Sequence, residues 1–362
     1  MAATECFLLD VGQGMSSVIV IPGGRVIIVD GGPTAEVPLE LLRRLPEPWT
    51  IEAIVVSHND SDHARGISGI VRAYFERIRY LYVLVDRAAK TPWIDELIET
   101  LGDEEYADLT TNKLRRLETE DKRKVLWPAN TPSESHDPRL LLLFPSFWDN
   151  RNAVLGSRPN DTSGVVELRS SSGCVLFPGD APKHVWEQLV QRHGRLECDV
   201  LVYPHHGAEI SSGAEDAAEW LLTDAVHCKE LVVFSVGTRN AHGHPDARAV
   251  AAAARLGGRV ACTQITPRCC SHPDRLAPGL MPPATYGERV SRSGMRPDGS
   301  KGVGCMGTVH LVLEPDRVLI TDLLQHQQEI DGCKQKDWTP MCRPAPAPLR
   351  RARGKKRNWP VQ

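Results

Sequence analysis

The stretch VVSHNDSDHARG, residues 55–66, decides how the rest of the chain is interpreted. It closes an apolar run that predicts a buried strand over residues 51–56. Four side chains that can ligate a metal follow at once: His58, Asp60, Asp62 and His63. Unpaired carboxylates are costly to bury, so a strand end that carries them is either solvated or binds a cation. Nitrogen and oxygen ligands together suit zinc or manganese. The alternative is a polar loop whose histidines occur by chance.

The composition is that of an ordinary soluble globular protein. The chain has 362 residues, enough for one large domain or two ordinary ones, with 41% hydrophobic and 25% charged residues. A net charge of -3 gives no global basic field, so nonspecific nucleic-acid binding cannot be argued from total charge. The N-terminus shows no signal peptide, and no apolar run is long enough to span a bilayer. We therefore expect a cytoplasmic protein without membrane association.

The remaining pattern mixes hairpins with strand–loop–helix units, which predicts an α/β fold of sheets covered by helices. Residues 17–22 and 25–30 predict a hairpin around Gly23-Gly24. Helices are predicted over 39–45, 67–77, 93–101 and 246–256, and further strands over 6–11, 81–85, 140–144, 164–168, 174–177, 200–203, 230–236, 259–263, 308–313 and 317–321. The charge-rich residues 103–124 are interpreted as a solvated helix face.

Four predicted strands end in polar residues of the same kind. The first is the strand over 51–56. The other three strands are followed by Asp180, by the pair His205-His206, and by Asn240 with His244. Ligands from separate strand ends converge when the strands share one edge of a sheet. One such end is a weak signal, whereas four in sequence are a strong one.

These stretches resemble the metallo-β-lactamase-fold hydrolases, and within them the ComEC-like branch of DNA-uptake proteins. The resemblance covers roughly residues 5–265 and the closing hairpin. It implies a four-layer αββα sandwich with metals at one edge. The matching motifs are DVGQG at 10–14, IVDGG at 28–32, SHNDSDH at 57–63, FPGD at 177–180, PHHG at 204–207, and SVG at 235–237 continuing to His244-Pro245.

The resemblance implies a role for each of these side chains. His58 and Asp60 face a first divalent metal, Asp62 and His63 a second, and Asp180 bridges them. His205 completes the second site, and Asp30 orients a ligating histidine from behind. Asp62, His206, Asn240 and His244 act on the substrate side, although His206 and His244 can equally serve only their own loops. The cofactor is one or two divalent ions, zinc or manganese, with magnesium acceptable.

Two departures from the common superfamily pattern weaken the first site. Asp60 stands where histidine is usual, as it does in the ComEC-like branch. A further histidine ligand usually precedes the bridging aspartate, but residues 158–164 read RPNDTSG. The first site is thus rich in oxygen and poor in ligands, which favours manganese or magnesium there.

The expected function is metal-dependent hydrolysis of a phosphodiester, as in a DNA or RNA nuclease, by a water molecule that the metal activates. His244 would donate a proton or a hydrogen bond to the leaving oxygen. Two alternatives stay open: a hydrolase of a small lactone, thioester or phosphoester on the same fold, and a metal-stabilised regulatory module without enzymatic activity. The partner is then nucleic acid or another phosphodiester, with a separately encoded protein partner also considered. The oligomeric state is not predicted.

Residues 1–325 are assigned to the hydrolase domain, with an irregular insertion around 264–307 that is rich in Cys, Pro and Gly. Cys269, Cys270, Cys305 and Cys342 are considered for a structural zinc, although no CxxC pair is present and buried thiols explain them as well. Residues 326–362 form an extension with a disordered tail, which from Arg343 carries seven basic residues and no acidic one. The tail either holds nucleic acid or only aids solubility.

Overall fold

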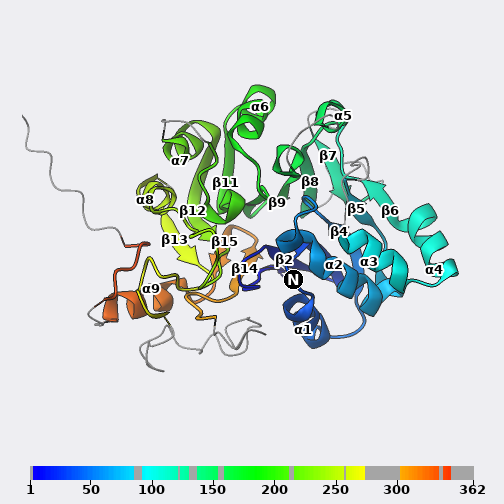
Figure 1. The fold of residues 1–362 in the computed structure, drawn as a ribbon, viewed down its shortest axis with the longest axis horizontal. Helices are drawn as coiled ribbons and strands as arrows, with labels where there is room; N and C mark the ends of the chain where they lie inside the picture. Colours follow the sequence, from blue (N-terminus) through cyan, green and yellow to red (C-terminus); the bar gives the residue numbers. More distant parts are fainter. Residues whose placement is uncertain are drawn as a thin grey trace, which may run out of the picture.

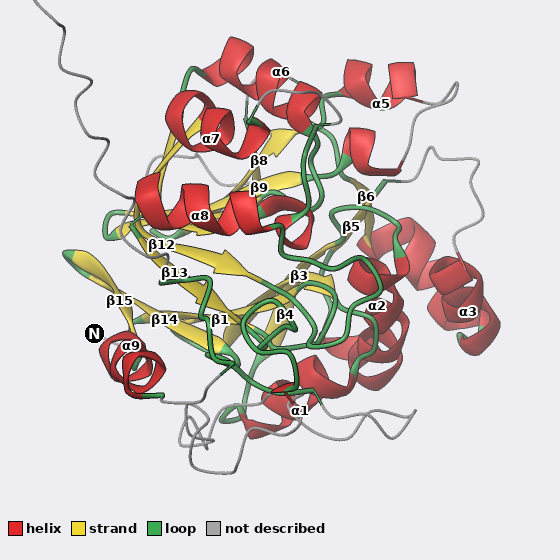
Figure 2. Ribbon diagram, turned by 60° about the vertical axis from the view of Figure 1, so that its left-hand side comes forward, coloured by secondary structure: helices red, strands yellow, loops and turns green. Residues whose placement is uncertain are grey.

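Two mixed β-sheets pack face to face with helices on both outer sides (Figure 1, Figure 2). The computed structural model describes residues 3–84, 92–120, 123–129, 137–153, 159–211, 216–256, 258–273, 302–333 and 337–343. The first sheet has the order β15 (Arg317–Ile320), β14 (Val309–Glu314), β1 (Thr4–Leu8), β2 (Ser16–Ile21), β3 (Arg25–Gly31), β4 (Thr50–Val55), β5 (Leu81–Val83) and β6 (Leu114–Arg116). The second has the order β13 (Arg259–Cys262), β12 (Val226–Phe234), β11 (Leu196–Val202), β10 (Gly173–Phe177), β9 (Val165–Ser170), β8 (Arg139–Phe144) and β7 (Lys124–Trp127).

The strands are apolar on both faces because both faces are buried. In β3, Ile27 and Val29 point into the core between the sheets, while Val26 and Ile28 point to the outer helices. This is the period-2 alternation of a strand that is covered on both sides. The predicted four-layer α/β sandwich is therefore confirmed.

Helices cover the two outer faces. The first sheet is covered by α1 (Glu36–Arg44), α2 (Ser61–Tyr74) and α3 (Pro92–Thr100), and the second by α6 (Lys183–His193), α7 (Ala217–Trp220) and α8 (Ala247–Leu256). The remaining helices are α4 (Asp103–Asp108), α5 (Phe147–Ala153) and α9 (Leu323–Gly332), with the short turns Phe75–Arg77, Leu109–Lys113, Pro159–Thr162, Pro204–Gly207 and Leu221–Ala225. Within the described ranges no helix combines the length and apolarity needed to cross a membrane.

The strands that lead to the predicted ligands run parallel. In the first sheet β3 pairs with β4 in parallel, and in the second β10, β11 and β12 do so. The carboxyl ends of these strands, and the residues that follow them, therefore meet along one edge of the sandwich.

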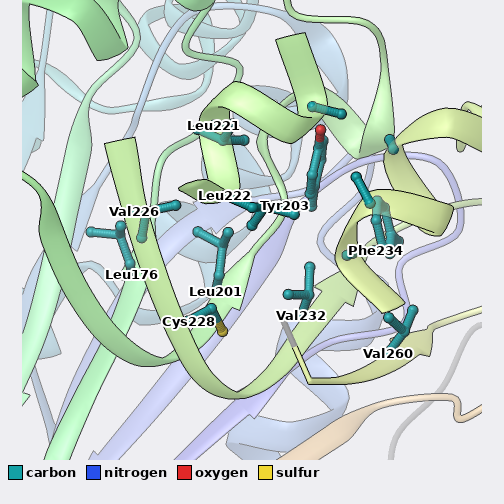
Figure 3. Packing of buried hydrophobic residues seen from close by; sticks show 14 of the residues in the cluster. Leu176, Leu201, Tyr203, Leu221, Leu222, Val226, Cys228, Val232, Phe234 and Val260 are labelled. Carbon is teal, nitrogen blue, oxygen red and sulfur yellow. The ribbon is translucent and has the colours of Figure 1, made fainter. Parts of the chain in front are cut away.

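Packing behind that edge fixes the strand ends. Tyr203 and Phe234, at the ends of β11 and β12, stack with ring centroids 4.7 Å apart. Figure 3 shows this pair together with Leu201, Val232 and the neighbouring leucines of the outer core of the second sheet. The residues that follow Tyr203 thus leave from a rigid position.

Several sequence-based element predictions differ from the structure. The helix predicted over 67–77 begins at Ser61 and ends at Tyr74, so Asp62 and His63 lie in its first turn instead of a loop. The apolar periodicity does not reveal this start, because the helix residues before Ala64 (Ser61, Asp62 and His63) are all polar. Of the charge-rich residues 103–124, only the first part is helical, and 114–116 form an edge strand. Helix α9 runs across residue 325, the predicted domain limit. Most of the predicted insertion and the basic tail lie outside the described residues.

Candidate metal centre

Asp30 is a fully buried carboxylate at the end of β3, and it organises the histidines around it. Its Oδ1 accepts a hydrogen bond from the Ser57 backbone N–H at 2.7 Å, and its Oδ2 accepts from the Ser57 hydroxyl at 2.8 Å. The Nδ1 of His63 donates to the same Oδ2, at 2.8 Å. The Nε2 of His63 is then left with a lone pair that points away from Asp30.

The same network orients His58. Because the Ser57 hydroxyl donates to Asp30, its oxygen accepts from the Nδ1 of His58, 3.0 Å away. The Ser163 hydroxyl also lies 3.5 Å from this nitrogen and accepts the backbone N–H of Asp180 at 2.8 Å. The hydrogen-bond partners therefore assign the Nδ1 tautomer to His58 and leave its Nε2 as an acceptor.

His206 is held in the same way from the second sheet. Its Nδ1 donates to the Ser235 carbonyl oxygen at 3.0 Å, which leaves Nε2 as the acceptor. This Nε2 lies 3.1 Å from the Nε2 of His63 and 3.2 Å from the Oδ2 of Asp62. In these tautomers the two Nε2 atoms and the Asp62 oxygen are all acceptors at contact distance, so the group requires a cation or a proton.

Asp180 lies among these histidines with both carboxylate oxygens engaged in different directions. Its Oδ1 is 3.0 Å from the Nε2 of His63 and 3.7 Å from that of His206. Its Oδ2 is 3.7 Å from the Nε2 of His58 and 3.6 Å from that of His205. A carboxylate in this position could contact a cation with either oxygen.

The ligand atoms of described residues form two groups, each within 4.8 Å: His58, His63 and Asp180, and Asp62, His63 and His206. The Nε2 of His58 and the Oδ1 of Asp180 are buried and have no hydrogen-bond partner. Buried polar atoms without partners are rare in folded proteins, and converging acceptors repel one another. A divalent cation resolves both problems, so this set of nitrogen and oxygen ligands fits the implied metal.

The pKa shifts of His63 and Asp180 indicate that the site favours an added positive charge. Burial disfavours the imidazolium form of His63, but Asp180 and Asp30 outweigh it and raise the pKa of His63 well above its usual value. Burial likewise favours protonated Asp180, but His63 and His206 outweigh it and hold the pKa of Asp180 well below its usual value. Without a cation, a proton on His63 supplies the charge that the carboxylates require.

Backbone strain is concentrated at this site. Asp30, His205 and His206 have φ angles of 58°, 51° and 53°, in the left-handed region that non-glycine residues rarely adopt. Such conformations cost free energy and persist only where the surrounding structure enforces them. The left-handed turn after Pro204 directs the two adjacent histidines into different environments.

That turn gives an arrangement that differs from the sequence-based one. His206 is 1% exposed and belongs to a ligand group, whereas the side chain of His205 is 37% exposed and belongs to neither. The prediction had His205 as the ligand and His206 on the substrate side. His205 instead lies at the rim, with Asp180 as its nearest carboxylate.

The two aspartates of the first motif also lie differently. Asp62 belongs to the group with His63 and His206. Asp60 is outside both groups; its Oδ2 lies 3.6 Å from the Nε2 of His58 and its side chain is 41% exposed. Asp60 is thus positioned at the open side of the first group.

Asn240 and His244, both predicted on the substrate side, have different contacts in the structure. Asn240 uses its amide inside its own loop: it donates to the carbonyls of Gly237 and His244 at 2.9 and 2.8 Å and accepts the His244 N–H at 2.7 Å. It therefore shapes the loop that carries His244. The His244 ring is half-buried, 5.7 Å from the His205 ring and 5.5 Å from that of His242. Burial and these histidines lower the pKa of His244 to about 4.

Three of the cysteines considered for a structural zinc lie near one another, because burial and then the neighbouring Cys342 and Cys269 raise the pKa of the Cys305 thiol well above its usual value. Neither of the two ligand groups found in the described part of the chain contains a cysteine. The Sγ of Cys270 contacts Asp337, and the Sγ of Cys305 lies 3.7 Å from the Nε2 of His326. Cys269, Cys270, Cys305 and Cys342 are all free thiols, and a structural zinc at these residues stays a prediction.

Three serines belong to the site and were not found from the sequence. Ser57 and Ser163 fix His58, and Ser235 supplies the carbonyl for His206 and donates to the Gly14 carbonyl at 2.7 Å. Serine is common at strand ends, so its residue type alone carries no signal. The position of Ser57 between an apolar strand and His58 was the available indication.

Comparisons with known proteins agree with this architecture. The family described as the metallo-beta-lactamase superfamily matches residues 9–183. Recombination protein 2 of Haemophilus influenzae is 44% identical over 73 residues, which are 18% of this chain and 9% of that protein. The chain therefore aligns with a small part of that relative.

Similar solved structures are more distant. A metal-dependent hydrolase of the beta-lactamase superfamily is 14% identical, with 71% of this chain and 94% of that one covered and a TM-score of 0.40. Human tRNase Z, short form, is 14% identical, with 55% and 77% covered and a TM-score of 0.35. Zinc-bound PqqB from Methylobacterium extorquens is 10% identical, with 55% and 72% covered and a TM-score of 0.34.

The family match covers the strands and motifs that carry Asp30, His58, His63 and Asp180, and the two-sheet sandwich supplies the edge at which they meet. The chain thus matches the metallo-beta-lactamase superfamily over residues 9–183 and has the fold of that superfamily, with His and Asp side chains placed to hold a metal.

Proposed function

We propose that this chain hydrolyses phosphodiesters, and that its natural substrate is a nucleic acid. The observation that supports this is the position of Asp180, which directs Oδ1 toward His63 and Oδ2 toward His58, so that it could contact a cation on either side. Cations held by these residues would supply Lewis acidity and would lower the pKa of a bound water. The partial relative named for recombination is in keeping with a nucleic-acid substrate.

The protein side chains then have separate tasks. Asp30 holds His58 and His63 with their acceptor nitrogens inward, so the ligands are in place before substrate binds. Asp62, whose side chain is 32% exposed, would orient the attacking water by accepting a hydrogen bond from it. His244 is neutral at pH 7, because its pKa is lowered to about 4, and so donates a hydrogen bond to the leaving oxygen.

The test is hydrolysis by the purified protein supplied with manganese, magnesium or zinc. The substrates are labelled DNA, labelled RNA and the generic diester bis(4-nitrophenyl) phosphate, each with a chelator control. Asp180→Asn and His63→Ala should abolish turnover of every substrate while leaving the fold intact by circular dichroism. The exposed Asp316→Asn is the matched control and should retain full activity.

The outcomes separate the proposed function from its alternatives. Turnover of a thioester or lactone, but of no phosphodiester, would establish the small-molecule hydrolase. Metal binding without turnover of any substrate would favour the regulatory module. Activity that survives in Asp180→Asn would refute the role given to the shared ligands.

A further inference from the structure

Helix α5 exposes aromatic side chains and turns polar side chains inward, which is the reverse of an ordinary surface helix. Phe147 and Trp148 are 39% and 60% exposed. In contrast, Asp149 points inward and accepts two hydrogen bonds of 2.6 Å from Arg192, and Asn150 donates to the Leu117 carbonyl at 3.3 Å. Surface helices normally bury their aromatic residues, so packing gives no reason for this arrangement.

The exposed residues form a small platform. The rings of Phe147 and Trp148 meet edge to face with centroids 5.2 Å apart. The guanidinium of Arg151, also exposed, lies 5.7 Å from the centre of the Trp148 ring. Two π-faces and one cation are thus presented together to solvent. We call Phe147, Trp148 and Arg151 the α5 platform.

The platform starts from the same edge of the sandwich as the metal centre. Phe144, which ends β8, pairs with Val165 of β9, and Val166 pairs with Phe177, which ends β10 shortly before Asp180. The end of β8 is therefore two strand spacings, about 10 Å, from the end of β10. Gly164, directly before β9, also reaches the site, because its N–H donates to the Ser57 carbonyl at 2.7 Å.

We propose that the α5 platform stacks bases of a single-stranded nucleic acid whose phosphodiester lies at the metal centre. Aromatic rings accept unpaired bases of any sequence, and an adjacent arginine adds attraction to the backbone phosphates. Bases within a duplex are already stacked and do not present their faces to Trp148. The inference rests on the proposed function and specifies its substrate as a single strand.

Binding tests the platform without requiring turnover. A fluorescein-labelled phosphorothioate DNA of about 12 nucleotides, which resists hydrolysis, is titrated with manganese-loaded protein and followed by anisotropy. Trp148→Ala should raise the Kd for the single strand by roughly 5- to 150-fold, the value of one base stack. Trp148→Tyr should retain most of the affinity. Tyr106→Ala, which removes another exposed ring from α4 (41% exposed), is the matched control and should bind as the wild type does.

Turnover then separates this inference from the proposed function. The kcat/KM for bis(4-nitrophenyl) phosphate should be unchanged in Trp148→Ala, whereas the KM for a single-stranded oligonucleotide should rise. If wild-type protein hydrolyses no phosphodiester, the proposed function fails, and the Kd comparison still decides whether the platform binds bases. Equal Kd values for Trp148→Ala and Tyr106→Ala would overturn the inference. So would loss of self-association by Trp148→Ala in sedimentation with single-strand binding intact, because the platform would then be a protein contact.

Discussion

Asp30 determines the orientation of two histidines with one carboxylate. It accepts directly from the Nδ1 of His63 and controls His58 through the Ser57 hydroxyl. Its own left-handed backbone, with a φ of 58°, places the carboxylate behind the ligands. The strain is tolerated because three hydrogen bonds fix the side chain.

Asp30→Asn should lower metal affinity and hydrolysis by about 10- to 100-fold, as is typical when a carboxylate behind a metal-ligating histidine is replaced. The amide keeps the shape of the carboxylate, but its NH2 group then faces a donor, either the His63 Nδ1–H or a Ser57 group. Two donors cannot form a hydrogen bond with each other. Metal content by elemental analysis and turnover of the generic diester provide the measurement. Asp322→Asn is the control, because Asp322 has nearly the same backbone, with a φ of 57°, in an exposed position. Full metal content in Asp30→Asn would contradict the assigned role.

Metal choice should depend on Asp60. Its carboxylate is the side chain nearest the open side of the His58 group, and it offers a hard oxygen in place of an imidazole nitrogen. We expect activity that is low in the purified protein and rises with millimolar manganese more than with zinc. Asp60→His should increase zinc retention and reduce the response to manganese. Wild-type protein that purifies with two tightly held zinc ions and ignores added manganese would rule out this preference.

The sequence predicted the residue types that gather at the site, because its apolar runs stop abruptly at clusters of His and Asp. The choice between His205 and His206 did not. Adjacent histidines look identical in a sequence, and the left-handed turn that separates them follows Tyr203, whose ring stacks on Phe234 across the second sheet. The use of the Asn240 amide within its own loop likewise depends on contacts that no spacing pattern reports.

At the scale of elements, α2 brings Asp62 and His63 to the edge by docking closely on β3. Gly66 of α2 faces the backbone of Gly31, and a Cβ at Gly66 would lie 2.1 Å from the Gly31 carbonyl oxygen. The Gly66 N–H also donates to the Gly32 carbonyl at 2.8 Å. The helix thus approaches the strand more closely than any side chain would permit.

Gly66→Ala should therefore reduce the free energy of unfolding by about 1–3 kcal/mol through overpacking, despite the higher helix propensity of alanine. It should also reduce metal affinity, because α2 must shift together with His63. Gly332→Ala, near the end of α9 with nothing within 4 Å of the added Cβ, is the control and should be neutral or slightly stabilising. Urea unfolding of the three proteins provides the comparison. Equal stability of Gly66→Ala and wild type would show that the helix can move without cost.

The anchoring of α5 predicts a specific loss of stability in acid. Burial raises the pKa of Asp149, but the hydrogen bonds from Arg192 and Ser146 outweigh it, and the pKa is lowered from its usual value. A lowered pKa in the folded state adds stability above the unfolded-state value of about 3.9, and this stability is lost as the pH falls through the folded-state value. Asp149→Asn should cost about 1–3 kcal/mol at pH 7, with the difference from wild type shrinking below about pH 4. A difference that does not vary with pH would exclude this ion pair as the cause.

Hairpins and buried strands were the elements that the sequence predicted well, because Gly-Gly turns and apolar runs are local signals. The hairpin of β2 and β3 around Gly23-Gly24 is confirmed. The start of α2 and the helix α5 were not predicted. The first turn of α2 consists of polar residues of the metal centre, and α5 carries its aromatic residues outward, so neither shows the periodicity of an amphipathic helix.

At the scale of the whole molecule, the metal centre joins the two sheets. His58 and His63 follow β4 of the first sheet, while Asp180 and His206 follow β10 and β11 of the second. The helices of each sheet pack on their own side, so the shared edge is held by the core between the sheets and by these polar groups. A cation bound there cross-links the two halves of the sandwich.

Metal binding should therefore stabilise the entire fold and not only the active-site loops. A ligand that binds only the folded state adds about 2.7 kcal/mol when its free concentration is 100 times its Kd. We expect the Tm of wild-type protein to rise with manganese in a concentration-dependent manner and to fall on chelation, with β-sheet and aromatic signals moving together. Asp180→Asn should show almost no shift, because it removes the carboxylate shared by both sheets, whereas the exposed Asp316→Asn should shift as wild type does. If chelation left the wild-type Tm unchanged while abolishing hydrolysis, the cation would be catalytic without joining the sheets.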